Sequence, residues 1–480
     1  MRTRVFLVAV LCCLGWAPPA GAAAGEAKAP SLEGAWLGTL KVPGMDLRVV
    51  FNITAKADGA LSGTLDSPDQ GATGIALSRV SRENGRVTIE VSAVHGRYEG
   101  TLSADGAEVS GKWTQGGIAL DLPLKRVKEA PKLQRPQEPK RPYPYRDEEV
   151  TYPNTRDGIT LAGTLTMPGA GAPFPAVILI SGSGQQDRDE SVFGHRPFLV
   201  LADYLTRRGI AVLRVDDRGV GGSQGDAAQA TSADFARDVL AGVAYLKTRQ
   251  EIDPTRIGLI GHSEGGLIAP LVATQARDVA FIVLLAGTGV PGDVIIEKQI
   301  ANLLQTGGAD QTAIDAALAA QRRVYEIVKN EADPNRAKEK VRAIVQESLA
   351  KLDEKQKEAL RGMESHYLDA QVQAATSPWF RFFITHDPKT VLRRVRCPVL
   401  ALNGELDKQV LSQDNLPAIE QALREGGNTR VTIRELPGLN HLFQTAKTGN
   451  VDEYARIEET MSPRALETVA QWIEAQTGRK

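Results

Sequence analysis

Apolar and polar residues alternate along the first part of the chain, from residue 31 to about residue 127. Leu47–Ile53 and Val87–Val91 are clear examples, and the pair Asn84–Gly85 stands one residue before the second of these runs. A period of two residues is typical of strands with one buried face, and an Asn-Gly pair is typical of a hairpin turn. We therefore predict an N-terminal all-β domain over residues 31–127, folded as a small antiparallel barrel or sandwich.

The pattern changes in residues 128–148, which carry five prolines among Lys, Arg, Gln and Glu. Because proline disfavours helix interiors and central strands, this segment is predicted to be a stiff, solvated linker. It separates the β domain from a longer domain that is predicted to run over residues 149–480.

Continuous apolar runs alternate with helical stretches in this longer domain. Runs such as Ala176–Ile180 and Ile257–Ile260 are typical of strands buried on both faces. The alternation predicts an α/β fold with a mostly parallel sheet covered by helices on both faces. Further strands are expected at Thr160–Met167, Ala211–Val215, Phe281–Leu285, Val399–Leu402 and Arg430–Leu436, and helices at Pro197–Arg208, Ala233–Lys247, from about Gly265, and at Pro463–Thr477.

Residues from about 291 to 392 interrupt the alternation. They are rich in Ala, Glu, Gln, Lys and Arg, with helical signals and no strand signal. On the order of one hundred helical residues between two strands is far longer than a normal crossover connection. We interpret this stretch as a helical cap inserted into the α/β domain.

The first 24 residues have the order of a secretory signal peptide. Two arginines precede an apolar stretch, Val5–Trp16, and small residues follow at Ala20–Ala24. The apolar stretch is shorter than the ~20 residues that span a bilayer, so we predict cleavage and export to the periplasm or beyond the cell. Two of the three cysteines leave with this peptide, and Cys397 is interpreted as a small buried apolar side chain.

Composition limits the partners of the mature chain. The formal net charge is −1, with 42% hydrophobic and 24% charged residues, as in soluble globular proteins. No basic excess favours nucleic acid, and no later segment is long and apolar enough to span a membrane. No group of His, Cys and Asp has the spacing of a metal site, so neither a metal nor a cofactor is expected.

Residues 261–266 read Gly-His-Ser-Glu-Gly-Gly and lie between a predicted strand and a predicted helix. This is a Gly-x-Ser-x-Gly turn, in which glycines avoid collisions and the serine hydroxyl is exposed at the carboxyl edge of the sheet. Ser263 is therefore the predicted nucleophile. The N-terminus of the following helix favours negative charge that develops beside it.

A serine hydroxyl needs a base, and in this type of fold the acid and then the histidine follow the serine along the chain. Among six histidines, only His441 follows a late strand, so it is the predicted base. Asp407 is the favoured acid, with Glu405 as its rival in the same loop. The two oxyanion donors are expected to be the backbone amides of Ser183 and Glu264.

At these motifs the chain resembles the α/β-hydrolase superfamily and looks like bacterial serine esterases. Ile-Ser-Gly-Ser-Gly stands at Ile180–Gly184, Asp-Arg-Gly-x-Gly-x-Ser at Asp217–Ser223, and Gly-His-Ser-x-Gly-Gly at residues 261–266. The resemblance covers about residues 149–480, and it implies ester hydrolysis through an acyl-serine intermediate without a cofactor. Ser181 departs from the pattern, because many relatives have histidine before the oxyanion-hole glycine.

The expected substrate is a small carboxylic ester whose short or medium acyl chain fits a partly apolar pocket under the cap. Three alternatives stay open: a serine peptidase of the prolyl-oligopeptidase type, an acyl thioesterase, and an envelope binding protein on an inactive hydrolase scaffold. The ~95 residues before the linker are too few for the β-propeller of prolyl peptidases. The β domain is expected to have a structural role or to form a homodimer.

Overall fold

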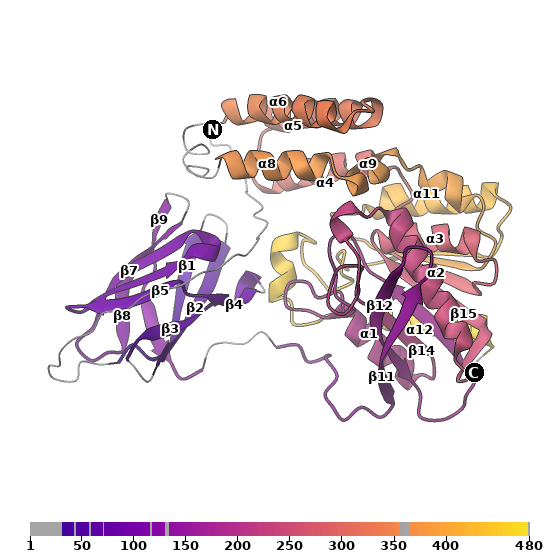
Figure 1. Cartoon of the computed structure of the whole chain (residues 1–480), viewed down its shortest axis with the longest axis horizontal. Coiled ribbons are helices and arrows are strands. Elements are labelled where there is room, and N and C mark those ends of the chain that lie inside the picture. Colours follow the sequence, from indigo (N-terminus) through magenta and orange to yellow (C-terminus); the bar gives the residue numbers. More distant parts are fainter. Residues whose placement is uncertain are drawn as a thin grey trace. The chain divides into compact units, whose positions relative to one another are not determined.

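The computed structural model describes residues 31–42, 45–56, 59–70, 72–115, 118–129, 134–352, 354, 357 and 364–478 (Figure 1). The chain divides into two compact units. Among the described residues, the N-terminal unit holds residues 31–134 together with 349–367, and the C-terminal unit holds residues 135–348 and 368–478. The predicted signal peptide, residues 1–24 with Cys12 and Cys13, lies outside the described residues.

The N-terminal unit is built on one antiparallel sheet with the strand order β4-β3-β2-β1-β10-β8-β7-β6-β5, and β9 pairs with β8. The side chains of Trp36, Phe51, Tyr98 and Trp113 share one buried core. β3 and β5 pack against each other although they are far apart in the strand order, so the sheet curls around that core as a barrel does. The strands are β1 Gly34–Val42, β2 Met45–Ala55, β3 Leu61–Ser67, β4 Ala72–Ala76, β5 Arg79–Glu83, β6 Arg86–Val91, β7 Gly96–Leu102, β8 Glu108–Gln115, β9 Ile118–Asp121 and β10 Leu124–Val127.

The C-terminal unit is built on an eight-stranded sheet with the order β11-β12-β14-β13-β15-β16-β17-β18. The pairs β11–β12 and β12–β14 are antiparallel, and every pair from β14 to β18 is parallel. Residues that follow β13, β15, β17 and β18 therefore emerge at one edge of the sheet. The strands are β11 Arg146–Asn154, β12 Ile159–Met167, β13 Phe174–Ile180, β14 Ala211–Val215, β15 Ile252–His262, β16 Phe281–Leu285, β17 Val399–Gly404 and β18 Val431–Leu436.

Helices cover both faces of this sheet, as the sequence predicted. Alternate residues of β13 face two different cores, with Ile178 in one and Val177 in the other. The continuous apolar run of this strand thus reflects burial on both faces. The first core is shared by α2 (Ser232–Thr248), α3 (Gly265–Gln275) and α11 (Ser412–Glu425), and the second by α1 (Pro197–Arg207) and α12 (Pro463–Thr477).

A helical cap is inserted between β16 and the neighbouring strand β17. Within the described part of residues 291–392 the chain forms helices and no strand, which confirms the predicted insertion. The helices are α4 Gly292–Thr306, α5 Gln311–Asn330, α6 Pro334–Ala350, α8 Glu364–Ala375, α9 Pro378–Thr385 and α10 Pro388–Leu392.

The proline-rich segment differs from the expected solvated linker in its second half. The Arg135 guanidinium donates hydrogen bonds to four backbone carbonyls of the C-terminal unit, those of Phe193, Gly194, Ala455 and Ile457. β11 then begins at Arg146, inside the stretch that was expected to be linker. Prolines prevent a helix in this segment, but its polar side chains can still bind carbonyl groups of nearby loops. The sequence pattern does not reveal such contacts.

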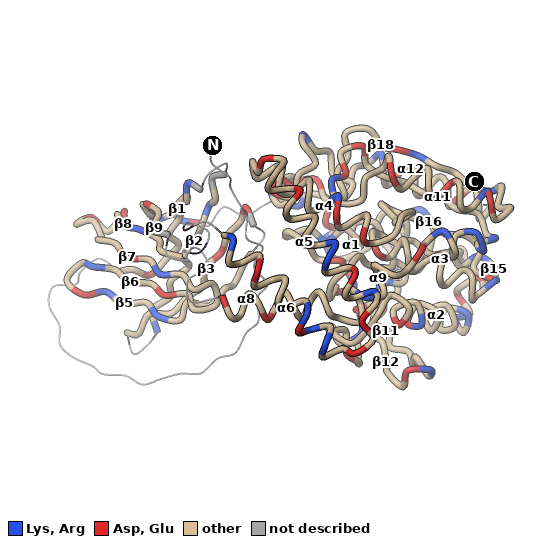
Figure 2. Tube along the Cα trace, turned by 90° about the horizontal axis from the view of Figure 1, so that it is seen from above, with Lys and Arg blue, Asp and Glu red and all other residues tan. Residues whose placement is uncertain are grey.

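Lys and Arg residues are interspersed with Asp and Glu residues along the trace of the chain (Figure 2). This distribution agrees with the formal net charge of −1. None of the helices formed by the described residues is long and apolar enough to cross a membrane.

Candidate active site

Ser263 lies in a tight turn between β15 and α3, formed by residues 261–266 and called the Ser263 turn below. Its φ of +53° is in the left-handed region, which a residue other than glycine adopts only where its surroundings hold it. Its amide donates a 2.8 Å hydrogen bond to the carbonyl of Leu285 at the end of β16. The half-buried serine therefore stands at the carboxyl edge of the sheet, held by the adjacent strand.

Close backbone contacts explain the glycines of the Ser263 turn. A Cβ on Gly261 would lie 2.0 Å from the carbonyl oxygen of Gly265, and a Cβ on Gly265 would lie 2.2 Å from that of Ile180. A Cβ on Gly266 would lie 2.4 Å from Cα of Gly287. The Ser263 turn packs closely against the start of α3 and the ends of the adjoining strands. This packing requires that residues 261, 265 and 266 carry no side chain.

Gly261→Ala is expected to destabilise the C-terminal unit, because backbone atoms stand where the methyl group must go. The free energy of unfolding should fall by about 3 kcal/mol or more, as in severe overpacking. Thermal unfolding followed by circular dichroism measures the effect. Gly169→Ala is the matched control, since a Cβ on exposed Gly169 would meet only the carbonyl oxygen of Pro144, at 3.9 Å. Equal melting temperatures for the two variants would contradict the expectation.

His441 and Asp407 form a buried hydrogen-bonded pair. Nδ1 of His441 lies 2.8 Å from Oδ2 of Asp407, and both side chains are almost completely shielded from solvent. Oδ1 of Asp407 accepts hydrogen bonds from the amides of Gln409 (2.8 Å) and Val410 (2.9 Å). These bonds orient the carboxylate, and the carboxylate orients the imidazole with its Nε2 directed away from the pair.

The structure brings the three predicted residues to one edge of the sheet. Ser263 follows β15, Asp407 follows β17 and His441 follows β18. His262, the neighbour of Ser263, packs its ring against that of His441 with the centroids 4.8 Å apart. Glu405, the rival acid, is exposed and accepts a 2.8 Å hydrogen bond from a backbone amide in the loop after β18.

The loop after β13, residues 181–184, lies against Ser263 and is called the Gly182 loop. A Cβ on Gly182 would be 3.3 Å from Cβ of Ser263. Within the described ranges, neither the amide of Ser183 nor that of Glu264 donates to a protein acceptor. The two amides that the sequence analysis selected are therefore available to an oxygen atom of a bound molecule.

The carboxyl group of Glu264 links the Ser263 turn to the cap. Its Oε1 accepts hydrogen bonds from the hydroxyl of Ser232 in α2 (2.6 Å) and from the indole of Trp379 in α9 (2.8 Å). Burial raises the pKa of this carboxyl. Trp379 stacks on Phe383 with the ring centroids 5.1 Å apart, so an aromatic pair of the cap adjoins the site.

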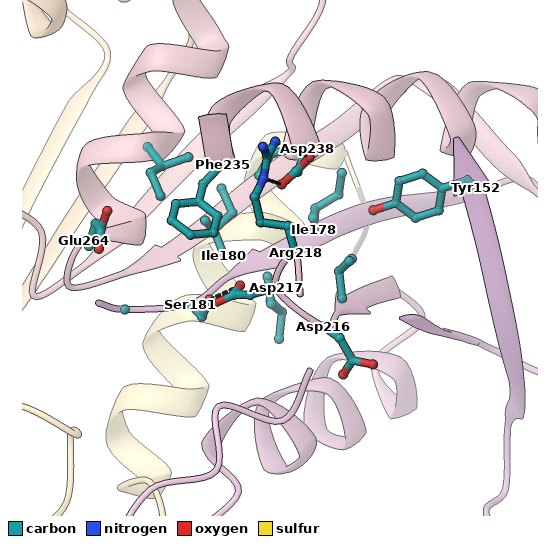
Figure 3. A pocket seen from close by; sticks show the side chains of 15 residues that line it. Tyr152, Ile178, Ile180, Ser181, Asp216, Asp217, Arg218, Phe235, Asp238 and Glu264 are labelled. Atoms are coloured by element: carbon teal, nitrogen blue, oxygen red, sulfur yellow. Dashed lines mark hydrogen bonds and ion pairs between the residues drawn. The ribbon is translucent and has the colours of Figure 1, made fainter. Parts of the chain in front are cut away.

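A cavity of about 40 Å³ lies beside the Gly182 loop (Figure 3). On its wall, Asp217 accepts a 2.9 Å hydrogen bond from the hydroxyl of Ser181. Burial, reinforced by nearby carboxylates, raises the pKa of Asp217 to about 7. Arg218 binds Asp238 and Asp157, so this motif ties the Gly182 loop, α2 and the β11–β12 turn together.

Sequence reasoning did not select three polar side chains around the site, namely Glu190, His262 and Trp379. Each acts through a contact with a segment distant in the sequence, and no spacing rule indicates such contacts. Within the described ranges, no cluster of three or more His, Cys, Asp or Glu side chains could hold a metal ion.

A family model described as the alpha/beta hydrolase family matches residues 177–455, more than half of the 480-residue chain. The chain belongs to the alpha/beta hydrolase family. The matched range of the hydrolase includes Ser263, Asp407 and His441, and the resemblance stated from the motifs is thereby confirmed.

Two curated relatives of this hydrolase are named as esterases. Esterase EstD of Thermotoga maritima is 24% identical over 314 residues, which are 65% of this chain and 65% of that protein. Esterase FrsA of Yersinia pestis is 33% identical over 127 residues, which are 26% of this chain and 28% of that protein. The hydrolase thus spans 65% and 28% of the lengths of these two relatives.

Solved structures also resemble the hydrolase. Est1E from Butyrivibrio proteoclasticus with bound ferulic acid is 18% identical, with a TM-score of 0.40, and the match covers 69% of this chain and all of that one. The alpha/beta hydrolase GrgF from Penicillium sp. sh18 is 18% identical, with a TM-score of 0.42, and the match covers 70% of this chain and 99% of that one.

Proposed function

We propose that this hydrolase cleaves small carboxylic esters through an acyl-enzyme intermediate on Ser263. The observation that carries the proposal is the buried Asp407–His441 pair, packed beside the turn that bears Ser263. The names of EstD and FrsA support esters as the substrate class.

In the first half-reaction, His441 accepts the proton of the Ser263 hydroxyl while the serine oxygen attacks the ester carbonyl carbon. Asp407 keeps a proton on Nδ1 of His441 and stabilises the imidazolium that forms. The carbonyl oxygen gains negative charge, and the amides of Ser183 and Glu264 donate to it beside the N-terminus of α3. His441 then gives its proton to the departing alcohol.

In the second half-reaction, water replaces the alcohol. His441 takes a proton from that water as its oxygen attacks the acyl carbon, and the same two amides stabilise the second oxyanion. Collapse of this intermediate releases the carboxylic acid and returns the proton to Ser263. The cycle consumes one ester and one water molecule and needs no cofactor.

A short or medium acyl chain is the preferred substrate in this proposal. Trp379 of the cap binds Glu264, the residue after Ser263, and stacks on Phe383, so an aromatic pair of the cap lies close to the Ser263 turn. Apolar surroundings favour an uncharged acyl group over a charged one.

A substrate panel tests the proposal. Wild-type protein should react with a fluorophosphonate probe at Ser263 and should hydrolyse p-nitrophenyl acetate and butyrate faster than long-chain esters. Faster cleavage of aminoacyl anilides would instead favour a peptidase, and faster cleavage of acyl-CoA a thioesterase. Absence of labelling at Ser263, in protein that is folded by circular dichroism, would favour a binding protein.

A further inference from the structure

Two buried side chains beside Ser263 take no part in the proton transfers described above. His262 precedes Ser263, and its Nδ1 lies 2.9 Å from Oε1 of Glu190. Its Nε2 lies 3.0 Å from the backbone carbonyl oxygen of His441. The ring is therefore in contact with an oxygen atom at each nitrogen.

These oxygen atoms determine how many protons the ring carries. A peptide carbonyl can only accept a hydrogen bond, so Nε2 of His262 must be protonated. Oε1 of Glu190 also accepts the amide of Gly182 at 2.6 Å, a short distance typical of an ionised carboxylate. Nδ1 therefore donates to this carboxylate, and a ring that donates at both nitrogens is an imidazolium.

The pair connects the three segments that form the site. Glu190 holds the Gly182 loop, His262 belongs to the Ser263 turn, and the carbonyl that His262 binds belongs to His441 itself. Glu190 has a φ of +52°, so its own backbone is held in a conformation rarely adopted by residues with a side chain.

We propose that Glu190 and a protonated His262 are positioning residues, which keep the Gly182 loop and His441 aligned with Ser263 for acyl transfer. The proposal rests on the function proposed above. The carboxylate is held by the amide of the loop and by the imidazolium, so movement of any of these segments breaks a charge-assisted hydrogen bond.

The proton on His262 depends on the charges that face the ring. Burial lowers the pKa of this imidazole, but the charge and hydrogen bond of Glu190, with a contribution from Asp407, outweigh burial and raise the pKa above its ordinary value. The ring of His441 is the other titratable group packed against it, and Asp217 is a further carboxyl near Glu190. Because the pKa of His262 is raised, the imidazolium is present below that pKa, and the pair is lost as the pH rises through it.

Glu190→Gln tests the pair, because it removes the negative charge but keeps an oxygen that can accept the amide of Gly182. The pKa of His262 should fall, and the decline of kcat/KM at high pH should begin at least about one unit lower than in the wild type. Glu458→Gln, which neutralises an exposed carboxyl, is the control and should leave the profile unchanged. A purely structural role would reduce kcat/KM by the same factor at every pH, and this result would overturn the proposal.

Nuclear magnetic resonance of protein labelled with 15N-histidine shows how many ring nitrogens of His262 are protonated, and it does not depend on enzyme activity. Both ring nitrogens of His262 should be protonated in the wild type at neutral pH, and one of them should lose its proton in Glu190→Gln. The resonances are assigned by their absence in His262→Gln or, where that variant does not fold, by their selective shift in Glu190→Gln. If one ring nitrogen of His262 is unprotonated in the wild type at neutral pH, the imidazole is neutral, and this result would overturn the proposal.

The two measurements separate this inference from the proposed function. Failure of the fluorophosphonate probe to label Ser263 would contradict the proposed function, even if His262 is doubly protonated. If Ser263 is labelled and the enzyme is active but His262 is neutral, the proposed function stands and the proposed positioning role of Glu190 and His262 is wrong.

Discussion

Ser263→Ala is expected to lower kcat for p-nitrophenyl butyrate by about 10⁶-fold, the loss typical of removing the nucleophile of a serine hydrolase. Alanine offers no oxygen for the acyl group, so water must attack the ester directly. Only substrate binding and the amides of Ser183 and Glu264 would then contribute to the rate. Release of p-nitrophenolate under steady-state conditions measures the loss, and labelling by the fluorophosphonate probe should disappear with it.

Ser110→Ala is the matched control for this variant. Ser110 is an exposed serine in β8 of the N-terminal unit, and its replacement should leave kcat unchanged. Circular dichroism of both variants shows whether the fold is retained. A folded Ser263→Ala protein with wild-type turnover would exclude the acyl-serine mechanism.

Asp407→Asn is expected to lower kcat by about 10⁴-fold while the protein stays folded. The amide side chain keeps the shape of the carboxylate, but it carries no charge to stabilise the imidazolium. Its NH₂ group also favours the His441 tautomer that is protonated at Nε2, and this tautomer cannot accept the proton of Ser263. Steady-state hydrolysis of the same ester measures the effect.

Glu405→Gln is the control for the acid, because Glu405 lies in the same loop and is exposed. Its replacement should leave kcat near the wild-type value. If Glu405→Gln were the more damaging of the two, the assignment of the acid would pass from Asp407 to Glu405, and the buried pair would have only a structural role.

The candidate site could be located from the sequence because its residues follow parallel strands. Ser263, Asp407 and His441 are far apart in the chain, but each comes shortly after a predicted strand of the sheet. Parallel strands end at one edge, so such residues are brought together whatever the lengths of the intervening segments. The insertion of the cap between two of these strands therefore did not obscure the prediction.

Two elements of the C-terminal unit had no readable signal. β11 is an edge strand that contains Pro153 and several charged residues, and α11 contains Pro417. Proline is unusual inside a strand or a helix, so neither segment has a typical sequence. β11 is stabilised by pairing with β12, and α11 by packing against the sheet core. The contacts of Glu190 were equally hidden, because they depend on three loops that meet only in the folded protein.

The cap joins the end of β16 to β17, which are neighbours in the sheet, so both of its attachment points lie on a rigid frame. The entropic cost of closing such a connection grows only slowly with its length. The sheet can therefore accommodate caps of different lengths without changes to its strands, provided that a donor replaces the indole of Trp379 at Glu264. A chimaera in which residues 292–385 are replaced by the cap of another hydrolase is expected to change the substrate preference and to keep the turn at Ser263 and the Asp407–His441 pair in place.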